Sequence, residues 1–347
     1  MMRNLIFSAA CLVCSGGLFA QAPVEGGAIR FGGEIPQEVD SIYERGLGYL
    51  VKSQADTGTW NGRGEHGITG LCLMAFLASG EDPNFGRYRS TVGRSVRALI
   101  LGQDSKTGYF ESSMYHHGFA MLALAEVYGA IDESTLWTGA EKGKTRPIAK
   151  ALDLAVRCAV TSQKNNRWGG WRYSPESTDA DTSVTGSVLM GLLACRNAGI
   201  EVPDEAIDKA LEYMRRSTGT SGFVNYSGGF GGMGESMNRS AVATLVYAVG
   251  QKRDWDEYKA TIGHISKQLE HSESGHKHYF IYYMAQALFQ GDYDSWQKWN
   301  QLTARKLAAE QAADGSFQGS YGQGYGTAMS LLAMALNYRF LPVYERF

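Results

Sequence analysis

One pattern recurs six times along the chain, at a spacing of about 50 residues, and it limits the possible folds more than any other feature. Each unit begins with a helical stretch that carries spaced charges, continues into a turn rich in glycine and aromatic residues, and ends in a helical stretch that is apolar nearly all round. Residues 150–199 show this order: KALDLAVRCAVTSQ, then KNNRWGGWRYSPESTDADT, then SVTGSVLMGLLACRNAG. A helix with one charged face lies at a surface, whereas a helix that is apolar on all sides is buried. The sequence therefore predicts buried inner helices that alternate with amphipathic outer helices.

This alternation predicts an all-α fold in which two concentric rings of helices close on themselves, an α6/α6 toroid. An open helical solenoid is the alternative, but it needs polar repeats at both ends, and the last unit is as apolar as the middle ones. Prolines near the starts of outer helices agree with these boundaries, because their missing N–H is least harmful there. They are Pro36, Pro83, Pro147 and Pro203. We expect a single toroid domain over residues 38–347.

The N-terminal residues MMRNLIFSAACLVCSGGLFA have the pattern of a secretory signal peptide: one arginine, a short apolar stretch, and small residues at the end. The stretch is too short and too rich in glycine and serine to favour a membrane span. We expect a signal peptide over residues 1–20, a linker over residues 21–37, and an exported protein, periplasmic or secreted, without an integral span after cleavage. Cys11 and Cys14 leave a lipoprotein open, although neither lies in a good lipobox.

Charge and cysteine content narrow the function classes. The formal net charge is −2 and no basic stripe is visible, so we expect no nucleic-acid partner. The other cysteines, Cys72, Cys158 and Cys195, each lie in an apolar helical pattern, as small buried hydrophobic residues do. An odd number does not make a disulfide framework, and a bond between Cys158 and Cys195 stays open.

The turns carry a specific motif. The first unit has Gln54, Gly58 and Trp60, and the sixth repeats the spacing with Gln311, Gly315 and Phe317; the second and third units keep looser versions, and the fourth and fifth are degenerate. This motif resembles the QW motif of squalene and hopene cyclases, whose repeat is shared with protein prenyltransferase β subunits. The motif is mainly structural, because a glutamine can bond backbone groups at the end of the outer helix while the ring packs over the turn.

The resemblance covers residues 38 to 340. A more particular group, exported single-toroid bacterial proteins described as prenyltransferase or squalene-oxidase repeat proteins, resembles this chain in GYGTAMSLLAMALNYRFLPVYERF and in GGWRYSP…DTSVTG. That group has no settled activity. In toroids of this family the N-termini of the inner helices line the mouth of a central cavity. The resemblance therefore implies a set of candidate binding residues: His66, Tyr115, His116, His117, Trp171, Arg239, His276, His278 and Tyr325. Asn238 and the loop aromatics Tyr173, Tyr226 and Tyr321 fall at the same level.

An acidic stretch, DADTS, precedes the third inner helix and contains the candidate catalytic residues Asp179 and Asp181. It resembles the DxDD motif of class II terpene cyclases, whose middle acid protonates an alkene. The motif is incomplete here: one alignment puts Asp181 on the acid and Thr182 on the final Asp, and the other puts Ala180 on the acid. The alternative is that Asp181 or Thr182 caps the helix, and carboxylates at a helix N-terminus are usually ionised.

No cofactor is expected, and no metal site. Protein prenyltransferases bind zinc through Asp, Cys and His, and His278 resembles the His position, but no Asp-x-Cys pair accompanies it. A different site built from the histidines at 116, 117, 276 and 278 stays open, although neither HExxH nor CxxC supports it. The glycines of GGFGGMG follow no apolar strand, so a turn is expected there rather than a nucleotide site.

Three functions remain after these observations. The incomplete acid motif favours a binding or scaffold toroid that holds an unknown small molecule, an isoprenoid or a saccharide, or a protein in its cavity. The first alternative is a terpene cyclase-like enzyme that acts on an isoprenoid with Asp181 as its acid. The second is a carbohydrate-active lyase or hydrolase, for which Arg172 and Arg239 are candidate site residues. Whether the protein is an enzyme stays open at this stage.

Overall fold

The computed structural model describes residues 35–60, 66–138, 145–227, 236–273 and 275–342. The predicted signal peptide, most of the predicted linker and the glycines of GGFGGMG lie outside these residues. The described chain is helical, with three isolated β-bridges and no strand within those ranges. No helix in the described part of the chain is long and apolar enough to cross a membrane.

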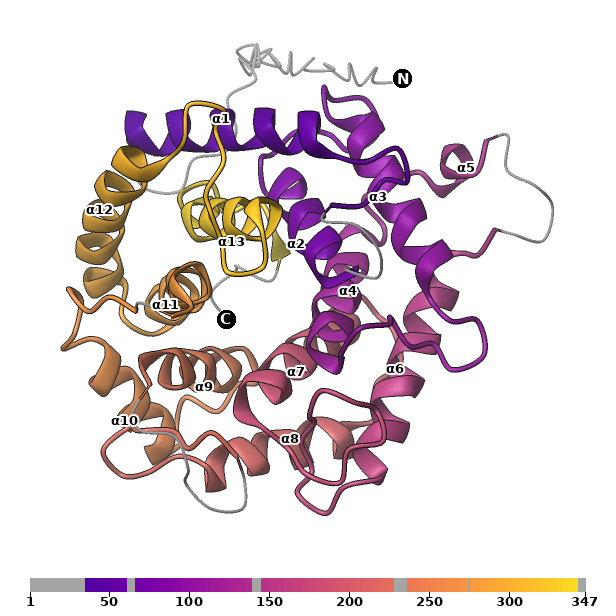
Figure 1. Cartoon of the computed structure of the whole chain (residues 1–347). Coiled ribbons are helices and arrows are strands. Elements are labelled where there is room, and N and C mark those ends of the chain that lie inside the picture. The colour runs from indigo at the N-terminus through magenta and orange to yellow at the C-terminus, as the bar shows by residue number, and fades with distance from the viewer. Residues whose placement is uncertain (1–34, 61–65, 139–144, 228–235, 274, 343–347) are drawn as a thin grey trace, which may run out of the picture.

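Two concentric rings of helices form the molecule, as the repeats predict (Figure 1). The outer ring contains α1 (Gln37–Ser53), α3 (Arg89–Gly102), α6 (Ile148–Lys164), α8 (Asp204–Arg216), α10 (Asp256–Ile265) and α12 (Tyr293–Glu310). The inner ring contains α2 (His66–Leu77), α4 (Met114–Val127), α7 (Thr182–Asn197), α9 (Met237–Val249), α11 (Lys277–Gly291) and α13 (Gln323–Met334). A short helix, α5 (Glu133–Leu136), lies between α4 and α6, and a 3₁₀ turn (Ala335–Asn337) follows α13.

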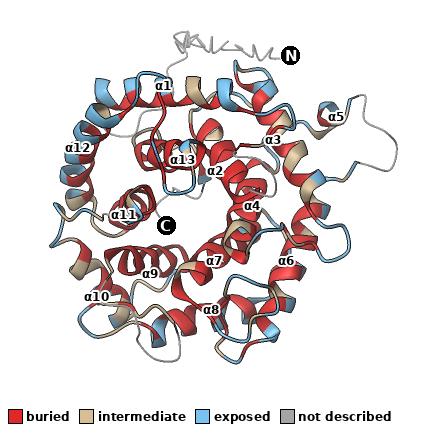
Figure 2. Ribbon diagram, in the orientation of Figure 1, coloured by how far each residue is buried: buried red, intermediate tan, exposed pale blue. Residues whose placement is uncertain are grey.

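The rings are closed. The last inner helix, α13, packs against the first, α2, and the last outer helix, α12, packs against α1. Figure 2 shows that the inner helices are buried along most of their length, whereas the outer helices expose one face. The fold class predicted from the sequence, an α6/α6 toroid, is confirmed.

Small residues bring the inner helices close together. At Gly118 of α4, an added Cβ would lie 2.5 Å from the backbone carbon of Ser187 in α7. No side chain larger than hydrogen fits at that distance, so this glycine sets the spacing between the two helices.

The QW glutamines join neighbouring repeats. Gln54 Nε2 donates to the carbonyl of Gly58 in its own turn and to the carbonyl of Thr91 in the next outer helix, at 3.1 and 3.0 Å. Gln311 Nε2 makes the same pair of bonds, to Gly315 and to Ile42 of α1, at 2.9 Å each. Gln103 and Gln163 repeat the arrangement. Because α1 is the first outer helix and Gln311 follows α12, the last one, the bond from Gln311 to Ile42 joins the two ends of the outer ring.

The sequence expectation for this motif was partly wrong. The glutamines bond the turn and the following helix, whereas the indoles bond the end of their own outer helix. Trp60 Nε1 donates to the carbonyl of Leu50 at 2.9 Å, and Trp171 Nε1 donates to the carbonyl of Ala159 at 2.8 Å. The indole N–H therefore takes the role that we had given to the glutamine.

The open question of a disulfide is also answered within the described residues. Cys72, Cys158 and Cys195 are all buried and free, so Cys158 and Cys195 do not form a bond with each other. They act as small apolar side chains in the core.

Candidate functional site

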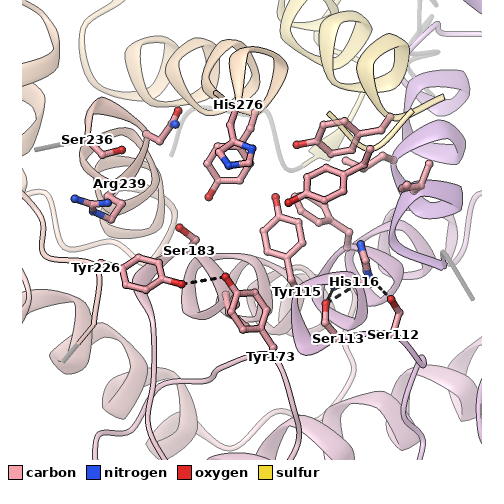
Figure 3. Close-up of a pocket in the computed structure, with 18 residues that line it drawn as sticks. Ser112, Ser113, Tyr115, His116, Tyr173, Ser183, Tyr226, Ser236, Arg239 and His276 are labelled. Atoms are coloured by element: carbon pink, nitrogen blue, oxygen red, sulfur yellow. Dashed lines mark hydrogen bonds between the residues drawn. The ribbon is translucent and has the colours of Figure 1, made fainter. Parts of the chain in front are cut away.

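A central cavity of about 480 Å³ opens at the N-terminal ends of the inner helices (Figure 3). Its lining comes from these ends and from the loops that precede them: Ile68, Leu71, Ser112, Ser113, Tyr115, His116, Phe119, Tyr173, Ser183, Val184, Tyr226, Ser236, Asn238, Arg239, His276, Tyr279, Tyr321 and Tyr325. Tyrosine is the most frequent residue type in this list. The cavity therefore lies where the resemblance placed it.

Five of the candidate binding residues line the cavity. They are Tyr115, His116, Arg239, His276 and Tyr325. They come from four inner helices or the loops before them, so the toroid gathers side chains that are far apart in sequence. Figure 3 shows Arg239 and His116 on opposite sides of the cavity.

Four candidates lie outside the lining: His66, His117, Trp171 and His278. His117 is fully buried between α4 and α6: its Nδ1 accepts the N–H of Phe110 at 3.2 Å, and its Nε2 donates to the carbonyl of Ala155 at 3.1 Å. Burial lowers its pKa to about 4, so it is neutral. His117 is therefore a structural link between the rings.

His278, His66 and Trp171 also lie outside the lining. His278 Nδ1 bonds the hydroxyl of Ser330 at 2.8 Å, and its Nε2 donates to the carbonyl of Gln318 at 3.1 Å. His66 packs against Phe110, and its Nε2 occupies the space beside Gly102, where an added Cβ would lie 1.8 Å away. Trp171 is fully buried. Position along the helix could not have separated these residues, because the neighbours Tyr115 and His116 both line the cavity whereas His117, the next residue, does not.

Tyr279 and Ser183 line the cavity and were missed by the sequence reasoning. Tyr279 belongs to the run HYFIYYM, which has no motif and reads as an apolar inner helix. The ring of Tyr279 lies 6.1 Å from that of Tyr115 and 4.6 Å from that of Tyr283. The only sequence signal was the spacing of Tyr279 and Tyr283 on one helix face.

Three polar groups of the lining are buried and have no hydrogen-bond partner among the described residues: the hydroxyls of Tyr115 and Tyr279 and the Oδ1 of Asn238. We call them the open cavity groups. Tyr279 and Asn238 are each only 8% exposed. Burial raises the pKa of Tyr279, against smaller opposing effects of the nearby hydroxyls of Ser183 and Tyr283. The phenols are therefore neutral and can both donate and accept.

Arg239 provides the cationic side of the cavity. Its Nε donates to the carbonyl of Val224 at 2.8 Å, and its guanidinium lies 6.0 Å from the ring of Tyr226. The hydroxyl of Tyr226 forms a hydrogen bond with that of Tyr173 at 3.1 Å, so these two side chains hold each other in place (Figure 3). Burial lowers the pKa of Arg239, against the opposing charge of the nearby Glu273, but an arginine stays charged at neutral pH.

His116 is the lining residue best suited to move a proton. Its Nδ1 bonds the hydroxyl of Ser112 at 2.9 Å, which leaves Nε2 for other contacts (Figure 3). Burial, helped by the nearby His66, lowers its pKa, so the imidazole is neutral. Across the cavity, His276 stacks on Tyr321 with ring centres 6.2 Å apart.

Asp181 is the N-cap of α7, and it lies behind the cavity wall. Its Oδ1 accepts the N–H of Val184 at 2.8 Å, while its Oδ2 is buried with no hydrogen-bond partner in the described chain. Burial raises its pKa from 3.8 to about 6, against the opposing effects of the Val184 N–H and Arg172. The nearby hydroxyl of Tyr226 also lowers the pKa of Asp181 slightly, although it makes no hydrogen bond to Oδ2 of Asp181.

Asp179 does not join Asp181. Its half-exposed side chain forms an ion pair with Arg172, and neither residue lines the cavity. The two carboxylates therefore do not form a catalytic pair, which corrects the expectation for Asp179. Arg172 was suggested as a site residue for carbohydrate chemistry. It is paired with Asp179 and does not line the cavity.

The histidines do not assemble into a metal site. No group of three or more His, Cys, Asp or Glu with metal-binding geometry occurs in the described ranges. His117 and His278 are bonded to other parts of the chain outside the lining, so the four-histidine arrangement that the sequence left open does not form.

No protein-family model matches the chain, and no curated protein matches it in sequence. Solved structures do match its shape. The GH76A α-1,6-mannanase from Salegentibacter sp. HEL1_6 superposes with a TM-score of 0.61 over 86% of this chain and 98% of its own, at 10% identity. The GH76 α-mannanase from Bacteroides thetaiotaomicron gives 0.58 over 87% and 96%, at 12% identity.

A type II terpene cyclase from Scytonema, solved with geranylgeranyl dihydroxybenzoate, gives a TM-score of 0.56 over 88% of this chain and 98% of its own, at 12% identity. Similarity at this level of identity shows the fold alone. The two groups of enzymes share the α/α toroid and differ in chemistry, so the fold does not choose between them.

Proposed function

We propose that this protein binds an anionic small molecule in its central cavity. The observation that carries the proposal is the charge of the lining: it includes Arg239 and the N-terminal ends of several inner helices, and none of its described residues is Asp or Glu. Helix N-termini carry partial positive charge and present free backbone N–H groups. An anion is the complementary ligand.

The size of the cavity supports binding over a purely structural role. Its volume of about 480 Å³ lies in the range of ligand pockets. A toroid that served only as a scaffold would gain stability from a filled centre. A wall of tyrosines around an unfilled centre is typical of a site that receives a ligand.

Glycoside hydrolysis is poorly supported. It generally requires two carboxylates that flank the bond to be cleaved, and the described lining supplies none. The Salegentibacter mannanase was solved with α-1,6-mannotetrose as an inactive variant in which two aspartates are replaced. The candidate aspartates of this chain, Asp179 and Asp181, do not form such a pair. Asp179 is paired with Arg172 at the surface, and Asp181 is buried as the N-cap of α7.

A second candidate is proton donation by Asp181 to an isoprenoid, and the unpartnered Oδ2 within the described chain favours it. A carboxyl group with a pKa of about 6 is partly protonated near neutral pH, as a general acid must be. However, Ser183 and Tyr226 line the cavity and Asp181 does not. The wall would have to move before this acid could reach a substrate, so we rank this function second.

Native mass spectrometry tests the first proposal. A small-molecule extract is separated into anionic and neutral pools, and each is mixed with the protein and with the Arg239→Met variant. We expect adducts from the anionic pool that Arg239→Met loses. The matched control is Arg253→Met, because Arg253 bonds Gln290 away from the cavity lining. Adducts from the neutral pool alone, or equal loss in both variants, would contradict the proposal.

Incubation with squalene or geranylgeraniol, followed by gas chromatography, tests the second. A cyclic product that Asp181→Asn abolishes would support proton donation. If the unaltered protein gives no product, that candidate fails.

We also propose that the chain is an exported member of the QW-repeat toroids. Four glutamines that make the same pair of bonds support the repeat assignment. Sequencing the N-terminus of the protein from its own cells tests export. A chain that starts near residue 21 agrees with cleavage, and one that starts at Met1 in the cytoplasm contradicts it.

A further inference from the structure

The open cavity groups indicate what kind of anion fits. Asn238 Oδ1 and the hydroxyls of Tyr279 and Tyr115 lie in the lining without a hydrogen-bond partner from the described protein. Water can serve such groups while the cavity is empty, but a ligand that displaces the water must replace its hydrogen bonds. A buried polar group left without a bond costs about 1–3 kcal/mol.

We propose that the ligand is a hydroxylated carboxylic acid, of the class of acidic sugars. The inference rests on the proposed function and adds the chemistry of the ligand. The carboxylate binds at Arg239, and the hydroxyls bind the open cavity groups.

The direction of the hydrogen bonds excludes several other anions. Asn238 Oδ1 only accepts, so it requires a ligand that donates. A fully ionised phosphate, sulfate or diphosphate offers acceptors alone and leaves this oxygen unsatisfied. A sugar hydroxyl donates and accepts, which also suits the two phenols.

A hydrocarbon ligand fits the open cavity groups poorly. An isoprenoid would displace water and return no hydrogen bond, which would leave Tyr115, Tyr279 and Asn238 unsatisfied together. One wall does consist of Ile68, Leu71 and Phe119, but six tyrosines share the lining with this single phenylalanine. Tyrosine combines an apolar ring with a polar end, which matches the apolar faces and polar edges of a sugar ring.

The arrangement of charge fits a single small acid. Asn238 and Arg239 are neighbours in the first turn of α9, so a carboxylate at Arg239 places an adjacent hydroxyl near Asn238. Charge-assisted bonds between arginine and carboxylate are among the strong ones in proteins. The volume of 480 Å³ corresponds to about sixteen liquid waters at about 30 Å³ each, which is room for a monosaccharide or disaccharide.

The rim extends the site outward. Tyr173 and Tyr321 line the mouth and are 50% and 53% exposed, although both are large aromatic residues. Exposed aromatic rings at the edge of a cavity can pack against further sugar units of a longer chain.

Isothermal titration calorimetry of the full chain tests the inference with four probes. The first is a set of uronic-acid disaccharides, which carry carboxylates and hydroxyls. The others are a neutral disaccharide, cyclohexanecarboxylate as an anion without hydroxyls, and farnesyl diphosphate as an anion with an isoprenoid chain. We expect at least one uronic-acid disaccharide to bind at least tenfold more tightly than every other probe.

The contrary outcomes separate the two proposals. Equal or tighter binding of cyclohexanecarboxylate or farnesyl diphosphate would overturn the inference and leave the anionic site standing. Equal binding of the neutral disaccharide would overturn the anionic site itself. Failure of every uronic-acid disaccharide to bind would overturn the inference.

Two variants test the role of the open cavity groups. Asn238→Leu and Tyr279→Phe should each weaken uronic-acid binding about tenfold, which corresponds to the loss of one hydrogen bond. Neither should change the binding of cyclohexanecarboxylate. If both variants bind the uronic acid as tightly as the unaltered protein does, the assignment of the hydroxyl contacts is wrong.

Discussion

Two sets of polar side chains lie at the same end of the toroid, and they differ in how fully they are bonded. Behind the lining, both ring nitrogens of His117 and of His278 have partners, and four glutamines each donate to two carbonyls, although Oε1 of Gln54 and of Gln311 is buried without a partner in the described chain. Within the cavity, the open cavity groups have none from the described chain. Both sets are buried, so exposure alone does not distinguish them.

The difference separates structure from function. A polar group whose bonds are all internal contributes to the fold, and it has nothing to offer a ligand. A buried polar group without internal bonds weakens the fold unless something else bonds to it. The first set should therefore matter for stability and the second for binding.

The largest effect is expected at a turn that joins two repeats. Gly315 has φ of +92°, and an added Cβ would lie 2.2 Å from the carbonyl oxygen of Arg45 in α1. Gly315→Ala combines backbone strain with a clash against a backbone atom, so unfolding in urea should show a loss of more than about 4 kcal/mol. Gly199, with φ of +82° and open space around it, is the matched control. Gly199→Ala should lose only about 1–2 kcal/mol, and equal losses would contradict the role of the turn.

The next effect concerns two adjacent histidines. His117→Phe removes the partners of the Phe110 N–H and the Ala155 carbonyl, so the free energy of unfolding should fall by about 3–4 kcal/mol. His116→Phe, one residue away but in the cavity lining, should change it by less than about 1 kcal/mol. Equal destabilisation by both variants would remove the distinction between the two sets.

Asp181 gives a pH-dependent prediction. Its folded pKa of about 6 lies above its ordinary 3.8, so the folded state holds a proton that the unfolded state loses between these values. Stability should therefore fall as pH rises from about 4 to about 6 and then level off. Asn can accept the Val184 N–H equally well, so Asp181→Asn should raise stability at pH 8 by about 2–3 kcal/mol and by little at pH 4.

Thermal unfolding across pH 4 to 8 measures this difference. Asp181→Ala, which loses the cap as well, should gain less than Asp181→Asn. A loss of stability in Asp181→Asn at pH 8 would show that the ionised carboxylate is needed by the fold.

The sequence predicted the architecture well for a physical reason. The apolar inner helices and the spacing of Gln54, Gly58 and Trp60 express contacts within one repeat and with its neighbour, and such contacts leave a periodic pattern. The position of the cavity was implied by the resemblance to the QW-repeat toroids and not by the repeat pattern itself. The partners of Gln311 could not be predicted, because they depend on how the two ends of the chain meet.

The site was predicted less well, because it depends on which way single side chains point. His116 and His117 look alike in sequence, yet one faces the cavity and the other links the rings. Asp181 was recognised as a possible cap, but the burial of its second oxygen arises from packing across the loops. Tyr279 was missed because a tyrosine within an apolar run gives no sign of whether its hydroxyl has a partner.

The central claim is that the open cavity groups serve a ligand, and two tyrosines test it most directly. Tyr279 has an open hydroxyl in the cavity, whereas the hydroxyl of Tyr43, buried in α1, donates to the carbonyl of Ala75 at 2.7 Å. The measurement is the affinity for the tightest uronic-acid disaccharide together with the free energy of unfolding, for each Tyr→Phe variant. Tyr279→Phe should lose about tenfold in affinity and keep or gain up to about 1 kcal/mol of stability, and Tyr43→Phe should lose about 1 kcal/mol and keep its affinity. The account is contradicted if Tyr279→Phe destabilises the protein as much as Tyr43→Phe does while its affinity stays unchanged.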